Sequence, residues 1–564
     1  MAYVITQNCC KDASCVPVCP VDCIRPVGGA GEFTGSEMLY IDPEACIDCG
    51  ACMDECPVGA VHYEDDLPES LARFKDVNAA YFERHPLEPD TSTPAPKHRP
   101  VTPGRLRIAV VGAGPAACYA ASELIAVDGV EVDLFERLPT PYGLIRSGVA
   151  PDHQHTKSVV DVFQRAFASP RFGTHFNVEV GRDIGHGDLL AHHHAVIYAV
   201  GATRTRDLGI PGEDLPGSHA ASDFVGWYNG HPDHAGHEFD LTGRRAVLIG
   251  NGNVAVDVAR ILLATPEHLA TTDIARHALE SLRHSQIDEV VIMGRRGLRH
   301  AAFSVGEFLA LGNLDGVDVV IDGDDDFDPK PDDDVETTTK LDIAREYAAR
   351  QTTPGNKRIV FRFLASPVDL VGEHRVEGLH VVQNSSGEDG GLVLGDPATD
   401  TELVETSLVL RSIGYRGSEI DGVAWDSAAG VIPNVAGRVV DEERMPVPGV
   451  YVTGWIKRGP RGVIGTNRTC AEETVASLLA DFDDGLLDRE VGSRQDLLRT
   501  MADRGAEPVT WSGWRAVDAA ERQLGEAESR PRVKLVEIDE LLATARGNAA
   551  DRDGAGEASD GRES

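Results

Sequence analysis

Short apolar runs that alternate with helix-forming stretches predict an α/β fold. Apolar strands are expected over residues 106–111 and 246–249, and each leads into a glycine-rich turn and a stretch of helical periodicity, the second of which covers 254–263. Further apolar strands at 130–135 and 289–294 follow these two helices. A strand, a glycine-rich turn, a helix and a second strand form a dinucleotide-binding unit, so two such units are expected.

Two segments lack this periodicity. Residues 85–104 contain six prolines, and because proline fixes the φ angle, we expect a semi-rigid linker there. Residues 547–564 contain only Gly, Ala, Asn, Ser, Asp, Glu and Arg, which offer too little apolar surface to offset the entropy of ordering, so a disordered tail is predicted. No apolar run reaches the roughly 18 residues that span a bilayer, and no membrane span is expected.

Charge and cysteine usage narrow the possible functions. The net charge of −38 argues against a nucleic-acid partner, because phosphate binding depends on Lys and Arg. The N-terminus has no basic stretch followed by an apolar segment, which predicts a cytoplasmic protein. Nine of the eleven cysteines fall within residues 9–56, and without an export signal this crowding indicates metal binding rather than disulfides.

The second of two cysteine motifs has the spacing of bacterial iron–sulfur proteins. Cys46, Cys49, Cys52 and Cys56 follow the pattern C-x2-C-x2-C-x3-C and precede Pro57. In this pattern, three closely spaced thiolates bind one cluster and the fourth binds the other. The first motif has the same spacing, so the two predicted ligand sets are Cys19, Cys46, Cys49 and Cys52 for one cluster and Cys9, Cys15 and Cys56 for the other.

Asp12 occupies the position of the second cysteine in the first motif. A hard carboxylate is a poorer ligand than a thiolate for cluster iron, so we expect one [4Fe-4S] cluster and, on the Asp12 side, a [3Fe-4S] or labile [4Fe-4S] cluster. Cys10 is an alternative to Cys9, although the spacing favours Cys9. Zinc is the competing interpretation, but zinc sites need four ligands per ion and rarely carry the trailing Cys-Pro.

Residues 3–24 and 40–61 together resemble a seven-iron bacterial ferredoxin. The resemblance covers about residues 1–65 and implies a small α+β ferredoxin-like domain. In that family, the cysteine after the first Cys-Pro lies near a cluster without binding it, which is the role implied for Cys23.

The first glycine-rich turn has the composition of a pyrophosphate-binding site. Gly112 and Gly114 begin a G-x-G-x-x-A sequence between a strand and a helix, where small residues let the backbone approach a pyrophosphate and the helix N-terminus stabilises its charge. Glu136 ends the next strand, about 20 residues further on, at the position of a carboxylate that accepts hydrogen bonds from ribose hydroxyls.

The second glycine-rich turn repeats the pattern but differs at the end of its next strand. The predicted nucleotide contacts in the turn are Asn251, Gly252, Asn253 and Val254. After the strand there is no ribose-binding acid; Arg295 and Arg296 stand there instead. Two guanidiniums suit a 2′-phosphate, so the sequence predicts NADP rather than NAD.

Residues 139–153 and 451–465 resemble the flavin-covering sequences of adrenodoxin reductase-type ferredoxin–NADP reductases. The resemblance extends over about residues 105–545 and implies an FAD site in the first unit and an NADP(H) site in the second. It also implies that Arg206 and Glu307 contact the pyridine nucleotide and that His153 and Asp257 lie near the flavin as candidate catalytic residues. The FAD contacts that it implies are Ala116, Glu136, Leu144, Val180, Trp455, Gly462, Val463 and Ile464.

The expected fold is therefore α/β, with two Rossmann-like dinucleotide-binding domains preceded by a small α+β ferredoxin-like iron–sulfur domain. The predicted boundaries are 1–65 for the two-cluster ferredoxin, 66–104 for the proline-rich linker, 105–208 with 408–546 for the FAD-binding domain, 209–407 for the NADP-binding domain and 547–564 for the tail.

Combined in one chain, the two halves resemble bacterial two-module ferredoxin/ferredoxin–NADP reductases. The resemblance implies hydride transfer between NADPH and FAD, then one-electron transfer between FAD and the clusters of the fused ferredoxin or an external ferredoxin. A downstream acceptor such as a monooxygenase is a further expected partner. The alternatives are an electron-input subunit of a larger enzyme of the glutamate-synthase type and an oxidant or iron sensor built on the Asp12-side cluster.

Overall fold

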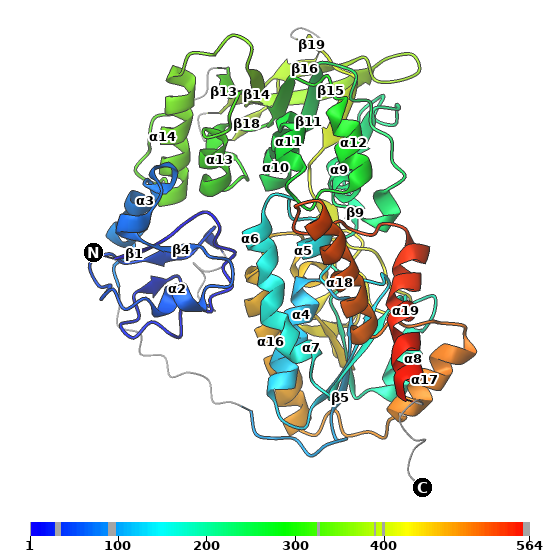
Figure 1. Cartoon of the computed structure of the whole chain (residues 1–564). Coiled ribbons are helices and arrows are strands. Elements are labelled where there is room, and N and C mark those ends of the chain that lie inside the picture. Colours follow the sequence, from blue (N-terminus) through cyan, green and yellow to red (C-terminus); the bar gives the residue numbers. More distant parts are fainter. Residues whose placement is uncertain are drawn as a thin grey trace.

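The structure is a computed structural model that describes residues 2–28, 35–87, 98–323, 327–387, 391–397 and 401–556, with side chains as far as residue 547. A small N-terminal module lies against two larger α/β units (Figure 1). Among the helices of the described residues, none is both long and apolar enough to cross a membrane.

The N-terminal module contains two small antiparallel sheets. β1 (Tyr3–Ile5) pairs with β4 (Val61–Tyr63), and β2 (Ile24–Arg25) pairs with β3 (Tyr40–Ile41). Helix α2 (Ala51–Glu55) carries Cys52, which is buried. The sheets and helices enclose a small core of their own that includes Cys15, Cys23 and Cys52.

Helix α3 (Phe74–Arg84) lies within the segment that was predicted to be a linker from residue 66 onward, and that prediction is wrong there. The helix buries Phe74, Val77, Tyr81 and Phe82 in the core of the N-terminal module, at the i, i+3, i+7, i+8 spacing of a helical face. The buried amide of Asn78 also bonds to the strands of the module. The linker residues 88–97 lie outside the described part of the chain.

The first α/β unit is built on a seven-stranded sheet whose central strands are parallel. Its order is β22 (Asn434–Val435), β23 (Arg438–Val440), β24 (Pro446–Val452), β8 (Ala195–Tyr198), β5 (Arg107–Val111), β6 (Glu131–Glu136) and β7 (Phe172–Phe176). The helices of this unit are α4 (Pro115–Ala126), α5 (Leu144–Ser147), α6 (Gln154–Lys157), α7 (Gln164–Phe167), α8 (His186–His192), α15 (Trp455–Arg458), α16 (Thr466–Asp483), α17 (Arg494–Asp503), α18 (Trp511–Ala527) and α19 (Ile538–Gly556).

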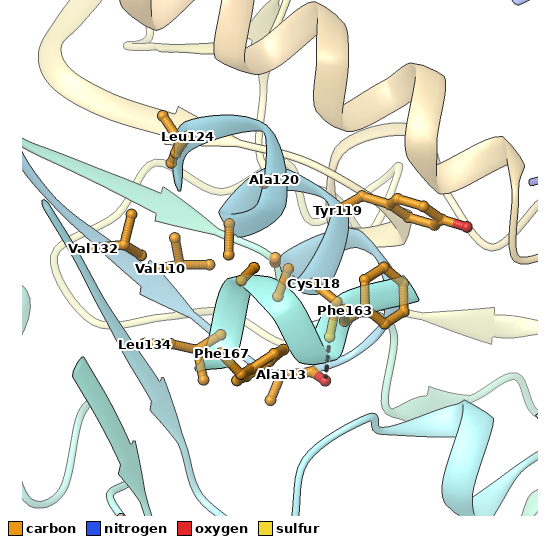
Figure 2. Packing of buried hydrophobic residues seen from close by; sticks show 14 of the residues in the cluster. Val110, Ala113, Cys118, Tyr119, Ala120, Leu124, Val132, Leu134, Phe163 and Phe167 are labelled. Atoms are coloured by element: carbon orange, nitrogen blue, oxygen red, sulfur yellow. Dashed lines mark hydrogen bonds between the residues drawn. The ribbon is translucent and has the colours of Figure 1, made fainter. Parts of the chain in front are cut away.

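Small residues on α4 allow this helix to pack closely on the sheet (Figure 2). Ala120 and Leu124 are fully buried in the same cluster as Val110 of β5 and Val132 of β6. The Cys118 thiol donates a hydrogen bond to the carbonyl of Ala113, 3.4 Å away, in the glycine-rich turn itself. The core therefore fixes the start of α4, where the sequence predicts a pyrophosphate site.

The second unit is built on a parallel six-stranded sheet. Its order is β10 (Ser218–Ala220), β20 (Leu408–Arg411), β11 (Arg245–Ile249), β12 (Glu289–Met293), β14 (Lys357–Arg362) and β13 (Val317–Asp322). An antiparallel sheet of β15 (Ala365–Val371), β16 (Gly378–Gln383) and β19 (Thr401–Glu405) accompanies it, with the short pair β17 (Ser385–Ser386) and β18 (Leu392–Val393). The helices are α9 (Ala221–Tyr228), α10 (Asn253–Leu263), α11 (Pro266–Leu269), α12 (Arg276–Arg283), α13 (Val305–Leu311) and α14 (Val335–Ala349).

Two chain crossings join the units. β9 (Arg204–Thr205) pairs with β21 (Tyr415–Arg416) where the chain leaves and re-enters the first unit. β20 belongs to the second sheet, although the predicted boundary at residue 408 would place it in the first unit, because its apolar residues pair with β10 and β11. Helix α19 continues from Ile538 to Gly556, past the predicted start of disorder, while residues 557–564 lie outside the described part. The division into domains otherwise stays a prediction.

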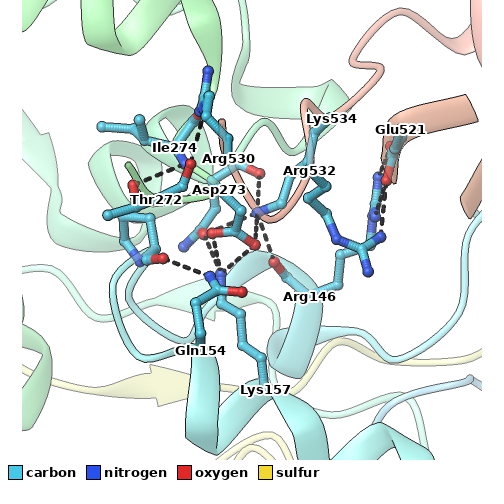
Figure 3. A network of polar contacts seen from close by, with 12 residues as sticks. Arg146, Gln154, Lys157, Thr272, Asp273, Ile274, Glu521, Arg530, Arg532 and Lys534 are labelled. Carbon is cyan, nitrogen blue, oxygen red and sulfur yellow. Dashed lines mark hydrogen bonds and ion pairs between the residues drawn. The ribbon is translucent and has the colours of Figure 1, made fainter. Parts of the chain in front are cut away.

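A buried ionic network connects the units (Figure 3). Lys157 of the first unit donates to both carboxylate oxygens of Asp273 of the second, at 2.7 and 2.9 Å. Lys534, after α18, lies 3.3 Å from the same carboxylate. Burial raises the pKa of Asp273, but the charges of Lys157 and Lys534 outweigh it and leave this pKa below its ordinary value.

Replacing Asp273 by Asn should destabilise the protein strongly. The change leaves the buried ammonium groups of Lys157 and Lys534 without their carboxylate, and such a loss costs about 3–5 kcal/mol. Urea unfolding followed by tryptophan fluorescence measures it. The control is Glu280→Gln, which removes an exposed partner of Arg283 and should cost at most about 1 kcal/mol. Equal effects of the two changes would contradict the structural role of the network.

Candidate functional site

The cysteines of the first predicted ligand set surround one cavity. Cys19, Cys46, Cys49 and Cys52 all line it, together with Cys23. Burial, and then the negative charges of Cys46 and Cys19, raise the pKa of Cys52 to about 12. Thiolates held this close need a compensating positive charge, which the iron ions of a cluster provide. The donor set therefore fits a four-iron cluster.

The second predicted ligand set also comes together. Burial, and then the charges of Cys9 and Cys56, raise the pKa of Cys15. Cys10 is buried in the core of the first α/β unit, in one cluster with Val58 and Ala60, and Cys9 and Cys56 pack against the same core. The thiols of Cys9, Cys15 and Cys56 therefore fit a second cluster, on the side of the module that faces the first unit.

Asp12 forms hydrogen bonds in the contact between the module and the first unit. Its Oδ2 accepts a hydrogen bond of 2.8 Å from the Tyr119 hydroxyl on α4, and its Oδ1 accepts one of 3.1 Å from the Ser14 amide. The backbone carbonyl of Asp12 accepts a hydrogen bond of 2.7 Å from Arg468 on α16. The carboxylate is thus already bound by groups other than a cluster.

The first glycine-rich turn has the geometry of a pyrophosphate site. Gly112 adopts a φ of 103°, and a Cβ there would lie 2.6 Å from the Ala199 carbonyl oxygen, so only glycine fits. Gly114 precedes the first residue of α4. Glu136 is the last residue of β6, and its carboxylate accepts hydrogen bonds from the amides of Ala113 (2.9 Å) and Leu138 (3.0 Å).

A second glycine-rich loop meets this turn. A Cβ on Gly454 would lie 2.6 Å from the Cβ of Ala116, so the loop that carries Trp455 touches the start of α4. Trp455 Nε1, Thr466 Oγ1 and two nitrogens of Arg458 are buried without a hydrogen-bond partner among the described residues. Because buried donors normally find acceptors, this loop fits a bound group rich in acceptor atoms, as FAD is.

The remaining predicted FAD contacts come from three further segments of the first unit. Leu144 is the first residue of α5 and is 49% exposed. Gly462 has a φ of 82°, and Val463 and Ile464 follow it, with Gly465 between them and α16. Val180 forms an isolated bridge with Ile184, beyond β7.

The second turn has the same backbone constraint. A Cβ on Gly250 would lie 2.1 Å from the Ser412 carbonyl oxygen, and Gly252 precedes the first residue of α10. Asn253 accepts a hydrogen bond of 2.7 Å from the Ser304 amide, which ties the turn to α13. Asn251 lies close to Gly294, since a Cβ on Gly294 would be 2.6 Å from the Nδ2 atom of Asn251. Val254 packs on the core of the second unit.

The two arginines after β12 have exposed side chains on a fixed backbone. Asn384 donates a hydrogen bond of 2.9 Å to the Arg295 carbonyl, and the Leu364 amide donates one of 3.3 Å to the Arg296 carbonyl. Exposed guanidiniums at this position fit a 2′-phosphate. Arg206 is also exposed and lies at the chain crossing, where its amide bonds to the Gly414 carbonyl.

Four ionisable side chains come together where α10 and α13 meet the first unit. His153 Nδ1 lies 4.0 Å from both Asp257 and Glu307, which come from α10 and α13. Arg260 donates a hydrogen bond of 2.9 Å to His153 Nε2. Because a guanidinium only donates, Nε2 accepts, and the proton of the neutral ring sits on Nδ1, facing the two carboxylates. Burial, and then the charge of Asp257, raise the pKa of Glu307.

Sequence reasoning missed several residues of these sites. Arg260 could have been found, because it lies one helical turn beyond Asp257 and bonds to it at 2.7 Å. Tyr119 and Arg468 carry no local signal, since their partner Asp12 is far away in the sequence.

Two known domain families match the chain. Residues 39–62 match the 4Fe-4S binding domain, a range that contains the second cysteine motif but not the first. Residues 106–291 match the pyridine nucleotide-disulphide oxidoreductase family.

Curated proteins and solved structures resemble the chain over most of its length. The probable ferredoxin/ferredoxin–NADP reductase of Mycobacterium tuberculosis is 46% identical and the alignment covers 97% of this chain and 95% of that protein; the Mycobacterium leprae protein of the same name is 43% identical. The structure of Mycobacterium tuberculosis FprA in complex with NADPH has a TM-score of 0.73 and 46% identity, and it covers 79% of this chain and 100% of that chain. These matches confirm the predicted α/β fold, and the chain belongs to the family of ferredoxin/ferredoxin–NADP reductases.

Proposed function

We propose that this ferredoxin–NADP reductase passes electrons between NADPH and its own N-terminal ferredoxin module through FAD. The reductase activity follows from the family: hydride transfer between NADPH and FAD, then one-electron transfer to a ferredoxin. The alternative of an electron-input subunit in a larger enzyme stays a prediction, which gel filtration with activity measurement of the isolated chain tests.

The observation that carries the proposal is a backbone contact between the module and the flavin loop. The Gly465 amide donates a hydrogen bond of 2.8 Å to the Cys10 carbonyl. Gly465 follows directly after Gly462–Ile464, the predicted flavin contacts, and Cys10 follows Cys9, a predicted cluster ligand. The proposed flavin site and the proposed site of the second cluster therefore lie on either side of one backbone contact.

Residues of the chain itself bind and orient the cofactors, the glycines among them through their backbone. FAD, when bound, accepts two electrons together and releases them singly, which a pyridine nucleotide does not do. The residues that we propose to hold it are Gly112, Gly114, Ala116, Glu136, Leu144, Val180, Trp455, Gly462, Val463 and Ile464. Those proposed for NADP(H) are Arg206, Asn251, Gly252, Asn253, Val254, Arg295, Arg296 and Glu307. Positioning is the main contribution of the protein to hydride transfer.

His153 and Asp257 are the proposed catalytic residues beside the flavin. Arg260 fixes the ring of His153 and neutralises Asp257 at the same time, because it bonds to both. We propose that this arrangement keeps the Nδ1 proton of His153 directed at the carboxylates between the two nucleotide sites.

We propose one [4Fe-4S] cluster on Cys19, Cys46, Cys49 and Cys52 and one [3Fe-4S] cluster on Cys9, Cys15 and Cys56. The bonds of Asp12 to Tyr119 and Ser14 support three iron atoms over four in the second cluster, because they leave this corner without a ligand. Location in the cytoplasm stays a prediction.

Changing Gly465 to Ala should uncouple the ferredoxin from the flavin. The added methyl group would lie 1.8 Å from the Lys11 carbonyl oxygen, so the module has to move away. We expect NADPH-driven reduction of the clusters, followed by EPR, to slow about tenfold or more, because a displacement of this size is costly for a reaction that depends on positioning.

Flavin content and ferricyanide reduction should stay unchanged in Gly465→Ala. Gly187→Ala is the matched control, because a Cβ there meets nothing within 4 Å. Cluster reduction at the wild-type rate in Gly465→Ala would show that electrons do not cross this contact.

Changing Asp12 to Cys should convert the second cluster. The new thiolate completes the four-cysteine motif, so we expect the iron content to rise by about one atom per chain and the EPR signal of the oxidised three-iron cluster to disappear. Tyr119→Phe removes the hydrogen bond to Asp12 without adding a thiolate and should leave both readings unchanged. An unchanged iron content in Asp12→Cys would mean that the wild-type site already holds four iron atoms.

A further inference from the structure

The ferredoxin module contacts the helix that carries Glu307. Helix α13 begins at Val305, and a Cβ on Gly306 would lie 2.7 Å from the Cβ of Gln7 in the module. Gln7 stands two residues before Cys9, a proposed ligand of the second cluster. The first turn of α13 therefore packs directly against the segment that leads to this cluster site.

Glu37 of the module supplies a hydrogen-bond acceptor to this turn. The first amides of a helix have no acceptor within the helix itself. In α13, the Glu307 amide donates to the Ser304 side chain at 3.3 Å, whereas the Val305 amide donates to Glu37 Oε2 at 2.6 Å. Because Val305 is buried, its amide needs an acceptor from the protein. The module provides that acceptor.

The position of Glu37 is fixed by α14, which lies beside α3 of the module (Figure 1). The Glu37 amide donates a hydrogen bond of 2.8 Å to Glu336, and Oε1 of Glu37 accepts one of 2.6 Å from Lys340, one helical turn further on. The Tyr40 hydroxyl donates to the same oxygen of Glu336, at 2.7 Å. The amide and both carboxylate oxygens of Glu37 thus have partners.

The first turn of α13 is also joined to the second glycine-rich turn. The Ser304 amide donates a hydrogen bond of 2.7 Å to Asn253 Oδ1. Asn253 and Glu307 are both proposed NADP(H) contacts. A displacement of this helix turn therefore disturbs two contacts with the nucleotide.

We propose that Glu37 is a positioning residue for the NADP(H) site: through the Val305 amide, it holds the helix turn that carries Glu307. The proposal rests on the proposed NADP(H) contacts of the second unit. Because coupling between two sites is reciprocal, bound NADP(H) in turn strengthens the contact of the module with α13. The ferredoxin module thus serves the nucleotide site as well as electron transfer.

Two substitutions of Glu37 separate its hydrogen bond from its ion pair. Glu37→Ala removes both, whereas Glu37→Gln keeps an oxygen that accepts from the Val305 amide and removes only the charge that pairs with Lys340. In the oxidised holoprotein, we expect the Kd of NADP⁺, measured from the flavin difference spectrum, to rise about tenfold in Glu37→Ala and at most about twofold in Glu37→Gln. In ferricyanide reduction, the KM for NADPH should rise with the Kd, and kcat should change at most about twofold.

Glu346→Gln is the matched control. Glu346 also joins the module to α14, through an ion pair of 2.7 Å with Arg73, but this pair does not involve α13. This variant should bind NADP⁺ as the wild type does.

A second variant changes the same contact from the side of α13. In Gly306→Ala, the added methyl group meets Gln7, so the module and α13 have to separate. The Kd of NADP⁺ should rise several-fold, although alanine itself favours a helix.

Wild-type affinity for NADP⁺ in both Glu37→Ala and Gly306→Ala would overturn the proposal. So would an equal loss of affinity in Glu37→Ala and Glu37→Gln, because the effect would then come from the ion pair with Lys340 and not from the hydrogen bond to α13.

Binding of NADP⁺ to the oxidised protein involves no electron flow, which separates this proposal from the proposed function. If NADPH leaves the clusters of the wild type oxidised, the internal transfer is wrong, and the NADP⁺ affinities still decide the role of Glu37. If Glu307→Gln weakens NADP⁺ binding but Glu37→Ala and Gly306→Ala do not, the NADP(H) contact of Glu307 stands and only the positioning role of Glu37 fails.

Discussion

The Lys11 carbonyl lies so close to the α-carbon of Gly465 that no side chain fits between the ferredoxin module and the flavin loop. This approach of two backbones places the Cys9, Cys15 and Cys56 set against the first α/β unit. Asp12 reinforces the contact through Tyr119 and Arg468. A motif position that usually carries a cluster ligand thus serves to hold two modules together.

The module also holds the second α/β unit. Glu37 accepts a hydrogen bond of 2.6 Å from the Val305 amide at the start of α13 and pairs with Lys340 of α14. Because Glu307 lies in the first turn of α13, the ferredoxin module contacts the helix that carries a proposed NADP(H)-binding residue. The module therefore contacts both α/β units of the reductase, to which it also belongs in sequence, and this raises the effective concentration of the ferredoxin beside them.

Local constraints made the two glycine-rich turns and the cysteine motifs predictable from the sequence. Gly112 and Gly250 lie at positions where a Cβ would collide with a carbonyl oxygen, and the cysteine spacing follows from cluster geometry, so both patterns are local. Contacts between distant residues could not be predicted in this way. Asp12 meets Tyr119, α3 buries its face in the ferredoxin core, and β20 joins the second sheet, each through a partner far along the chain. Residues 74–82 do carry the apolar spacing of a helical face, but the sequence does not show which core this face contacts.

Anaerobic mixing of the holoprotein with NADPH over a wide range of protein concentrations tests the central claim most directly. Absorbance follows the flavin, and EPR of rapidly frozen samples follows the clusters. The account predicts that the flavin is reduced first and that the clusters are then reduced with a rate constant independent of protein concentration, because donor and acceptor belong to one molecule. A rate that rises in proportion to protein concentration, or clusters that stay oxidised, would contradict it.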